Sequence, residues 1–417
     1  MSVATELVAA TARVVPLTEA VELNPRPDRN ALPDNLEVSF VPMAAVEAAT
    51  GRLAASAIRP FGEVKKGYTV FREGAVLFAK ITPWMENGKM AVARDLRNGV
   101  GCGSTEFHVL RPRPGVDPHY VYYFVSNARF RAEAAHHMTG AVGQKRVPAA
   151  FLQQCLVPLP DLDTQRRIVA EIDKQFSRLD EAVANLRRVK VNLKRYKAAV
   201  LDAAMKGRTV AGSGAGADEF PIGWQCSTVG ELASVGTGAT PARSNEAFYR
   251  GGTIPWVTSS AVNEPFVDAV DQFVTDAALR QTNLTLYPPG TLLVAMYGEG
   301  KTRGKCSELR IAATTNQALA ALQADSAVRP WLKLFLEHNY DNTRRIASGG
   351  VQPNLNLGLI RAIRVPLPPV DEQHRIVAEV DRRLSIVREV EAEVDANLKR
   401  AQPLRQAILA MAFAVSA

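Results

Sequence analysis

The sequence predicts an α+β fold in which two mixed α/β domains are separated by two long antiparallel coiled-coil helices and related by a pseudo-twofold internal repeat. The first observation is the repeat itself: residues 157–207 return at 365–415 without a gap, at an offset of 365 − 157 = 208 positions. The second is a run from Asp163 to Lys206 that contains neither proline nor glycine. A duplication on this scale organises the whole chain.

The repeat divides the 417 residues into four segments and a linker. VPLPDLDTQRRIVAE in the first copy and VPLPPVDEQHRIVAE in the second agree at 11 of 15 positions. The stretch GRTVAGSGAGADEFP between the halves is rich in Gly, Ala and Ser, which is typical of a flexible linker. The predicted boundaries are a globular domain at 1–156, a long helix at 157–207, a linker at 208–221, a second globular domain at 222–364 and a second long helix at 365–417.

The first long segment has the apolar spacing of a coiled-coil helix, with a seam of residues seven apart and others at the three- and four-residue steps. At ~1.5 Å per residue such a helix is roughly 65 Å long, which is too long for the core of a small domain. Asp163 is its expected N-cap. The seam residues are Leu179, Leu186, Leu193 and Val200, and the intervening ones are Phe176, Val183, Val189 and Tyr196.

The second long helix is predicted to begin near Asp371. Pro403 lies inside it, and an internal proline kinks a helix or ends its first section. Two copies of one unit usually associate about a twofold axis, which sets two such helices antiparallel. The seam is the shifted counterpart of the first: Val387, Val394, Ala401 and Ile408, with Leu384 and Leu398 between them.

The two globular domains are diverged copies rich in short strands. Strand-like apolar runs occur at 38–43 and 75–81 in the first domain and at 253–259 and 291–297 in the second. VSFVPMAAV aligns with IPWVTSSAV at an offset of 254 − 38 = 216, whereas GQKRV aligns with VQPNL at 351 − 143 = 208. The difference of 216 − 208 = 8 predicts a net deletion of eight residues in the later half of the second copy.

Composition and motifs argue against a membrane, metal or catalytic protein. No apolar run reaches ~18 residues, and the first residues lack the pattern of a secretory signal, so we expect a cytoplasmic protein. The four cysteines and six histidines show no metal-ligand spacing. GEGKT at 298–302 lacks the first glycine of a phosphate-binding loop, because Ala295 stands there. We therefore expect no catalytic residue, no metal and no cofactor on this chain.

The net charge of +8 permits a nucleic-acid partner. Two units related by a twofold axis can each contact one of two segments of duplex DNA, whose backbone has the same symmetry. Arg and Lys pair with guanine edges or phosphates, and Asn and Gln pair with adenine. For any one candidate the alternative is an ordinary solvated loop. The candidates are Lys80, Lys89, Gln144, Lys145 and Arg146 in the first domain, and Thr258, Ser259, Tyr297, Lys301, Thr302, Arg303, Lys305, Asn316, Gln317, Gln352 and Asn354 in the second.

Five segments of the second half occur in an order that is specific to one family. They are FPIGWQCSTVGELASVGTGATPARSN, GGTIPWVTSSAV, MYGEGKTRGKC, TTNQALAAL and VQPNLNLGLIRAIRVPLPPVDEQHRIV. Together they resemble the specificity subunit of type I restriction–modification systems. The first half matches more loosely, since it lacks the GW entry but keeps VPLPDLDTQRRIV. The resemblance covers nearly the whole chain.

The resemblance implies that each globular domain is a target recognition domain that reads one half of a bipartite double-stranded DNA site, while the helices fix the spacing. It also implies that the helices dock two methyltransferase subunits and that restriction subunits join the complex. The S-adenosylmethionine, ATP and magnesium sites would then lie on those partners, with no membrane involved. The competing functions are a solitary DNA methyltransferase or nuclease with unrecognised motifs, and a coiled-coil scaffold without nucleic acid.

Four apolar residues outside the seam are candidates for contact with the partner subunits. Packing onto the adjoining globular domain is the alternative for each of them. The residues are Ile168, Val169, Ile376 and Val377.

Overall fold

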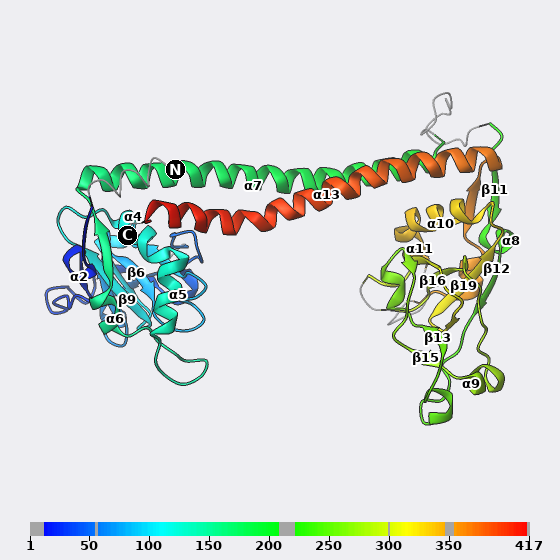
Figure 1. Ribbon diagram of the computed structural model, residues 1–417, viewed down its shortest axis with the longest axis horizontal. Helices are drawn as coiled ribbons and strands as arrows, with labels where there is room; N and C mark the ends of the chain where they lie inside the picture. Colours follow the sequence, from blue (N-terminus) through cyan, green and yellow to red (C-terminus); the bar gives the residue numbers. More distant parts are fainter. Residues whose placement is uncertain (1–11, 55–56, 208–221, 299–300, 347–353, 415–417) are drawn as a thin grey trace. The chain divides into compact units, whose positions relative to one another are not determined.

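The computed structural model in Figure 1 describes residues 12–54, 57–207, 222–298, 301–346 and 354–414. They form two compact units. Unit 1 comprises Met1–Arg188 and Val394–Ala417, and unit 2 comprises Val189–Glu393. Each unit thus contains one globular domain and parts of both long helices. The predicted linker at 208–221 lies outside the described residues.

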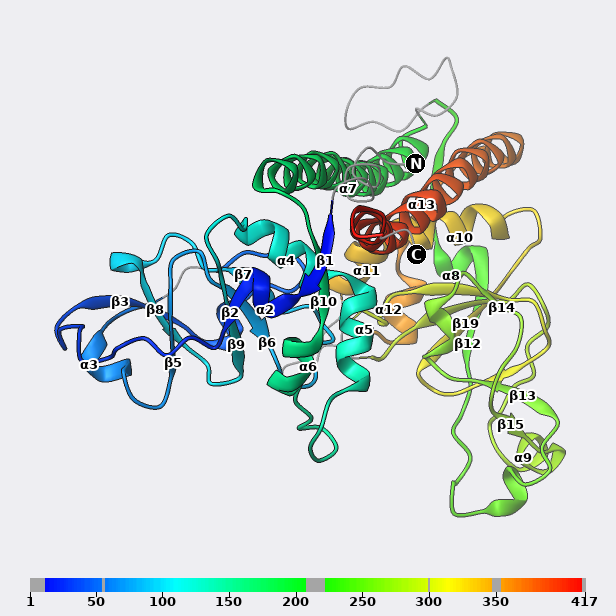
Figure 2. The same cartoon turned by 60° about the vertical axis from the view of Figure 1, so that its left-hand side comes forward.

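Two four-stranded sheets build the globular part of unit 1 (Figures 1 and 2). The order β2-β9-β6-β7 is antiparallel, and the order β4-β3-β8-β5 contains a parallel β3–β8 pair. A separate β1–β10 pair adjoins the long helix. The strands are β1 (Arg13–Pro16), β2 (Val21–Leu23), β3 (Glu37–Val41), β4 (Ala57–Pro60), β5 (Thr69–Arg72), β6 (Val76–Ala79), β7 (Met90–Val92), β8 (Val100–Gly103), β9 (Phe107–Pro112) and β10 (Leu156–Leu159).

Helices cover one face of the antiparallel sheet of unit 1. α4 contacts β6, β7 and β9, and side chains of α5 and α6 join the same core cluster. The helices are α2 (Leu17–Ala20), α3 (Phe61–Val64), α4 (Pro118–Ser126), α5 (Ala128–His136), α6 (Ala149–Gln154) and α7 (Leu162–Met205), with 3-10 turns η1 (Met43–Ala45) and η2 (Arg97–Gly99). α7 begins in unit 1 and ends in unit 2.

Unit 2 has a five-stranded sheet of order β12-β19-β16-β17-β14, a three-stranded sheet of order β15-β13-β18 and a β11–β20 pair. Its strands are β11 (Gln225–Thr228), β12 (Ala233–Thr237), β13 (Ile254–Val257), β14 (Phe266–Val267), β15 (Phe273–Val274), β16 (Leu292–Ala295), β17 (Cys306–Leu309), β18 (Thr314–Thr315), β19 (Leu319–Ala324) and β20 (Arg364–Leu367). Its helices are α8 (Val229–Leu232), α9 (Asp276–Gln281), α10 (Arg329–His338), α11 (Tyr340–Arg345), α12 (Leu357–Arg361) and the first part of α13 (Val370–Ala412), which ends in unit 1, with η3 (Glu246–Phe248) and η4 (Ala261–Asn263). The four strand-like runs predicted from sequence thus correspond to β3, β6, β13 and β16.

The same hydrogen bond closes the core of both units, which confirms the internal repeat. The buried phenol of Tyr120 donates to the carbonyl of Pro158 (2.5 Å), and the buried indole of Trp331 donates to the carbonyl of Pro366 (2.7 Å). The acceptors are 366 − 158 = 208 residues apart. Because a buried O–H or N–H needs a partner, each aromatic ring ties α4 or α10 to the strand that leads into a long helix.

The offset between equivalent residues changes along the chain, as predicted. One set of backbone hydrogen bonds recurs at the end of β6 and of β16, and it joins three pairs of equivalent residues: Lys80 and Met296, Glu106 and Ala318, and Val147 and Leu355. Their offsets are 296 − 80 = 216, 318 − 106 = 212 and 355 − 147 = 208. The net loss of eight residues therefore occurs in two steps of four.

The start of α7 differs from the prediction, and in α13 the structure excludes one of the two effects predicted for Pro403. The carboxylate of Asp161 accepts from the backbone N–H of Thr164 (2.8 Å), so Asp161 and not Asp163 caps the start of α7. α13 continues through Pro403 to Ala412, so the proline does not end the helix. Unit 1 holds the start of α7 and the end of α13, and unit 2 holds the other two ends, which makes the helices antiparallel within each unit.

The seam between the long helices is buried where it meets each globular core. In unit 1 the Arg405 guanidinium lies 4.3 Å from the centre of the Phe176 ring and forms an ion pair with Asp180. In unit 2 Val200 packs in one core cluster with Ile376 and Val380. These contacts are why the compact units include helix segments that the predicted domain boundaries left out.

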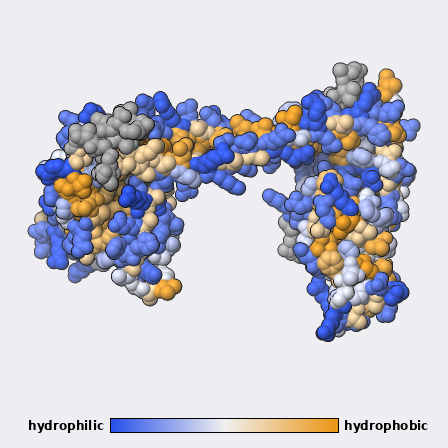
Figure 3. Space-filling model, in the orientation of Figure 1, coloured by the Kyte–Doolittle hydropathy of each residue, from blue (hydrophilic) through white to orange (hydrophobic). Residues whose placement is uncertain are grey.

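Two residues assigned to the seam lie outside it. Val189 is 39% exposed and Tyr196 is 48% exposed. The prediction was wrong because both lie three residues after a seam leucine, whereas Phe176 and Val183 lie three residues before one. That offset places Val189 and Tyr196 beside the seam on the helix surface. Figure 3 shows that apolar side chains recur along the visible surface of the long helices.

Candidate nucleic-acid interface

Three segments of unit 1 meet at the end of β6. The backbone N–H of Lys80 donates to the carbonyl of Glu106 (2.9 Å), and the N–H of Val147 donates to the carbonyl of Lys80 (2.8 Å). We call residues 80–82, 105–106 and 139–147 the strand-end face of unit 1. It brings together four of the predicted residues: Lys80, Gln144, Lys145 and Arg146.

Residues 139–146 form a closed loop that presents two candidates to solvent. Thr139 and Arg146 exchange backbone hydrogen bonds of 3.0 and 2.8 Å. Gly143 has a φ of +79°, a left-handed conformation that glycine adopts without strain. The turn leaves Gln144 and Lys145 exposed. An amide and an ammonium group are therefore available at the tip of the loop.

The Arg146 side chain is engaged within the chain. Its Nε and Nη2 atoms donate to the two carboxylate oxygens of Glu106 at 2.9 and 2.8 Å. This bidentate pair holds the pKa of Glu106 below its ordinary value, chiefly through the hydrogen bonds from Arg146. The carboxylate is therefore ionised near neutral pH, and the pair fixes the end of the loop to the segment before β9. Arg146 therefore has two candidate roles: it can position the 139–146 loop, or it can contact a base.

A buried histidine contacts the end of the same loop at the backbone of Val147. His108 Nε2 lies 2.8 Å from the carbonyl oxygen of Val147, and its Nδ1 lies 2.9 Å from Nδ2 of Asn24. Burial lowers the pKa of His108, so the ring is neutral at pH 7, and the carbonyl acceptor requires the proton on Nε2. Sequence reasoning missed His108 because its partners lie 39 and 84 residues away along the chain.

Two predicted lysines occupy equivalent positions and are both tied to a neighbouring loop. Lys89 Nζ donates to the carbonyl of Met43 (3.1 Å) and lies 4.8 Å from the centre of the Trp84 ring. Lys305, at an offset of 305 − 89 = 216, donates to Oδ1 of Asn263 (2.8 Å). Both side chains are half-buried. These contacts orient the lysines and stabilise the β6–β7 and β16–β17 connections.

A helix holds the backbone of the same connection in both units. In unit 2 the hydroxyl of Tyr340 donates to the carbonyl of Lys301 (2.6 Å), and Arg344 donates to the carbonyl of Arg303 (3.2 Å). In unit 1 Arg131 of α5 donates to the carbonyl of Glu86 (2.5 Å). The predicted residues of the β16–β17 connection divide into exposed Tyr297 and Lys301 and half-buried Thr302 and Arg303.

The predicted amides of unit 2 that the structure describes are Asn316 and Gln317, just before β19, and Asn354, next to Leu355, whose N–H donates to the carbonyl of Met296 after β16 (3.1 Å). Asn316 caps the turn before β19, since its Oδ1 accepts from the N–H of Ala318 (3.1 Å). Gln317 is exposed, and its Oε1 accepts from the hydroxyl of Thr240 (2.5 Å). Asn354 is half-buried beside Leu355, while Gln352 lies outside the described residues.

Thr258 and Ser259 follow β13 and are half-buried. The Thr258 hydroxyl oxygen lies 3.0 Å from that of Ser260, so these short side chains pair with each other at the strand end. The unit 2 candidates that the structure describes thus share one end of the sheets.

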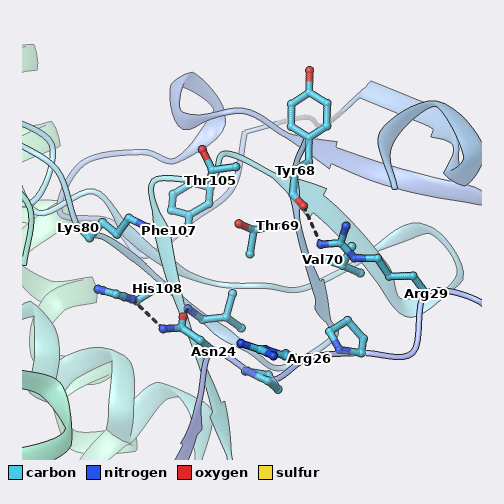
Figure 4. A pocket seen from close by; sticks show the side chains of 13 residues that line it. Asn24, Arg26, Arg29, Tyr68, Thr69, Val70, Lys80, Thr105, Phe107 and His108 are labelled. Atoms are coloured by element: carbon cyan, nitrogen blue, oxygen red, sulfur yellow. Dashed lines mark hydrogen bonds between the residues drawn. The ribbon is translucent and has the colours of Figure 1, made fainter. Parts of the chain in front are cut away.

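A basic groove of about 580 Å³ adjoins the strand-end face of unit 1. Figure 4 shows Lys80 at one end of it, Arg29 at the other, and Arg26 along one side. The loop after β2 supplies both arginines. Sequence reasoning missed them because single arginines in a proline-rich loop form no periodic pattern.

Among the residues that the structure describes, no group of three or more His, Cys, Asp or Glu side chains is arranged to hold a metal ion. The same part of the chain contains no helix that is both long and apolar enough to span a membrane. The cysteines of that part, Cys102, Cys155, Cys226 and Cys306, are unpaired thiols.

The comparisons with known proteins agree with this duplicated architecture. The sequence matches the family of the type I restriction modification DNA specificity domain twice, at residues 13–188 and 221–396. The chain belongs to this family. Each match runs from a globular domain into a long helix, as the repeat requires.

Individual relatives of the specificity family cover different shares of the chain. The type I restriction enzyme EcoAI specificity subunit of Escherichia coli is 37% identical over 166 residues, which cover 40% of this chain and 28% of that protein. The HsdS subunit from Thermoanaerobacter tengcongensis has a TM-score of 0.71 at 21% identity and 97% coverage of both chains. A structure from work on assembly and conformational transition of the type I R-M system has a TM-score of 0.74 at 20% identity, covering 97% of this chain and 98% of that one. These likenesses confirm the fold.

The four residues predicted to contact partner subunits lie against the cores of this specificity chain. Ile168 and Ile376 are both 0% exposed and belong to the core clusters of unit 1 and unit 2. Val169 and Val377 are half-buried against the same clusters. The isoleucines therefore present no surface to another subunit, and packing onto the adjoining globular domain accounts for them.

Arg146→Ala and Glu106→Gln are expected to weaken binding of the cognate DNA by similar factors, on the order of tenfold, with the double variant no weaker than either single one. The reason is that the pair positions one loop as a unit. A double-mutant cycle on DNA affinity measures this coupling. A larger loss for Arg146→Ala alone, together with relaxed preference at one base position, would instead assign Arg146 to base contact.

Proposed function

We propose that this chain is the non-catalytic, sequence-specific DNA-binding subunit of a type I restriction–modification complex. Each globular domain reads one half of a bipartite double-stranded site, and the long helices set the separation of the halves. The observation that carries the proposal is a duplicated backbone framework with different side chains at equivalent positions. The counterpart of the strand-end face of unit 1 comprises residues 296–298, 317–318 and 354–355, which we call the strand-end face of unit 2.

The equivalent positions differ in chemistry while the backbone hydrogen bonds around them recur. Unit 1 has an ammonium, a carboxylate and a guanidinium where unit 2 has a thioether, a methyl and an amide. The pairs are Lys80 and Met296, Glu106 and Ala318, and Arg146 and Asn354. Base contacts carry sequence information, so a constant frame with a changed surface fits two domains that read different half-sites.

Partner docking is supported by a second apolar stripe on each long helix, three residues after the seam. On α7 it includes Val189 (39% exposed) and Tyr196 (48%). On α13 it includes Val390 (37%), Leu404 (50%) and Met411 (43%). Tyr196 and Leu404 are repeat-equivalent, since 404 − 196 = 208.

A heptad-spaced stripe on each of two equivalent helices fits one helix from each of two identical partners. We assign these partners as two methyltransferase subunits, with restriction subunits joining the assembly. The S-adenosylmethionine, ATP and magnesium chemistry belongs to those subunits. These stripes replace Ile168 and Ile376 as the proposed docking surface.

The test is a footprint of the chain assembled with methyltransferase subunits on DNA that carries its target. We expect two short protected blocks flanking an unprotected spacer. Methylation mapping in cells that carry the complex identifies both blocks independently. One continuous block, or no protection at all, contradicts the proposal.

The chain alone provides the matched control for catalysis. Incubated with DNA and labelled S-adenosylmethionine, or with DNA and magnesium, it is expected to transfer no methyl group and to cut no strand. Transfer or cleavage by the isolated chain would favour the solitary enzyme.

A further inference from the structure

The connection after the first strand of each main sheet carries exposed arginines that the proposed reading residues do not include. It comprises residues 24–36 between β2 and β3 in unit 1 and residues 238–253 between β12 and β13 in unit 2. We call these segments the arginine loops. Their exposed arginines are Arg26 and Arg29 in unit 1 and Arg243 and Arg250 in unit 2.

The arginine loop of unit 1 lines the basic groove beside the strand-end face (Figure 4). Arg26, Arg29 and Lys80 line it, and no Asp or Glu side chain is among the described residues that do so. His108 at its base is neutral at pH 7 because burial lowers its pKa. The Glu106 carboxylate, whose charge interacts with Lys80, is already paired with Arg146, so the three cations leave the groove attractive to an anion.

The backbone of this loop is fixed before any ligand binds. Pro25 and Pro27 flank Arg26. Each proline ring fixes its own φ angle, and Pro27 also restricts the backbone conformation of Arg26 before it. The Arg29 guanidinium donates to the carbonyls of Lys65 (2.6 Å) and Tyr68 (3.3 Å), which uses two of its five N–H donors. A charge held on a stiff loop loses little conformational freedom when it binds a phosphate.

The arginine loop of unit 2 is anchored in a comparable way. The hydroxyl of Tyr249 donates to the carbonyl of Pro241 (2.6 Å), and its ring lies 6.1 Å from that of Trp256. Arg243, Arg250 and Tyr249 line a cavity of about 720 Å³ together with Glu246 and Gln272. Arg250 and Glu246 are 3.8 Å apart but 87% and 83% exposed, so water screens their attraction.

Each arginine loop also adjoins the same point of its unit. In unit 1 Thr105, just before β9, lines the groove with Arg26. In unit 2 the equivalent residue, Gln317 (317 − 105 = 212), accepts from Thr240 of the arginine loop. The loops therefore border the residues proposed to read bases in both units, although the loop sequences have diverged.

We propose that the arginine loops are the phosphate-contacting elements of the two domains, with Arg26 and Arg243 binding the DNA backbone next to the bases read by the strand-end faces. This inference rests on the proposed DNA-reading function. In each domain the arginine loop then contributes DNA affinity that is independent of base sequence, and the strand-end face contributes base specificity.

Arg26→Ala and Arg243→Ala test the inference in the chain assembled with its methyltransferase partners. Binding is measured to the cognate duplex and to duplexes with one altered half-site, across 0.05 to 0.5 M salt. Each variant is expected to weaken binding to all duplexes alike and to lower the salt slope by about one, so that its loss of affinity relative to the wild type is about eightfold greater at 0.05 M than at 0.5 M salt. The methylated sequence should stay the same.

Arg26→Lys and Arg243→Lys are expected to restore the slope, because a phosphate accepts a point charge. Arg111→Ala and Arg364→Ala, on strands β9 and β20 outside the loops, are matched controls that should leave it unchanged. The inference would be overturned if Arg26→Ala and Arg243→Ala left the salt dependence unchanged, or if they weakened binding to the cognate sequence alone. The proposed function would still stand in that case, provided that the wild-type complex binds the bipartite duplex. If the wild-type complex binds no bipartite duplex, both fail.

Discussion

Inserting four residues into each long helix should change the half-site separation that the complex accepts by about two base pairs. The insertions fall within Leu179–Val200 of α7 and Val387–Ile408 of α13. Four residues add ~6 Å of helix, and one base pair rises ~3.4 Å along duplex DNA. On a target with the original spacer, one half-site is then missed, and binding should fall on the order of 100-fold or more.

The long helices have the properties that such a ruler needs. α7 is one helix over Leu162–Met205, and α13 is one helix over Val370–Ala412, with Pro403 included. An insertion of four residues makes about 1.1 turns, so the seam stays near its original face. Lengthening both helices keeps the antiparallel pair matched.

The measurement is selection from a duplex library in which the spacer varies and both half-sites are constant. A replacement of four exposed residues at the same positions, without a change of length, is the control and should retain the original spacer. An insertion variant that assembles with its partners and still selects the original spacer would exclude the ruler role.

The framework of this fold is predictable from sequence because it depends on short-range patterns. Heptad spacing is local, and it correctly predicts α7 and α13. Short apolar runs are local too, and they predict β3, β6, β13 and β16. The repeat at an offset of 208 extends these predictions to both halves and predicts a net deletion of eight residues, and the structure shows that this deletion occurs in two steps of four.

The side chains of the interface are less predictable because their partners lie far away in sequence. Arg146 resembles a free base-reading arginine until Glu106, 40 residues earlier, is seen to bind it. Lys305 is engaged by Asn263, 42 residues earlier. A sequence pattern records residue types at neighbouring positions, and it does not record which distant carboxylate or amide folds against them.

Sequence alone also leaves open which apolar residues of the long helices are buried by the chain's own core. Ile168 and Ile376 lie outside the seam, and sequence alone allows either a partner or the chain's own core to cover them. The structure resolves this choice, since both are 0% exposed in their own units. The residues that remain exposed at regular spacing, Tyr196 and Leu404 among them, then become the stronger candidates for docking.

Tyr196→Glu and Leu404→Glu are expected to remove one methyltransferase subunit each, and the double variant both. A glutamate in the centre of an apolar helix interface leaves an unpaired charge out of water, which costs several kcal/mol. Association at the affected stripe should weaken on the order of 100-fold or more. Native mass spectrometry of the assembled complex counts the bound subunits directly.

The matched controls are Lys194→Glu and Gln402→Glu, a second repeat-equivalent pair (402 − 194 = 208) two residues before the stripe and exposed in the structure. Two residues turn a helix by about 200°, so these glutamates point away from the docked helix and should leave both subunits bound. Both stripe positions are already exposed, so the isolated variants should melt as the wild type does. Full assembly of the double stripe variant would show that the docking surface lies elsewhere on the chain. Loss of methyltransferase subunits in the control variants alone would show that it lies on the opposite side of the helices.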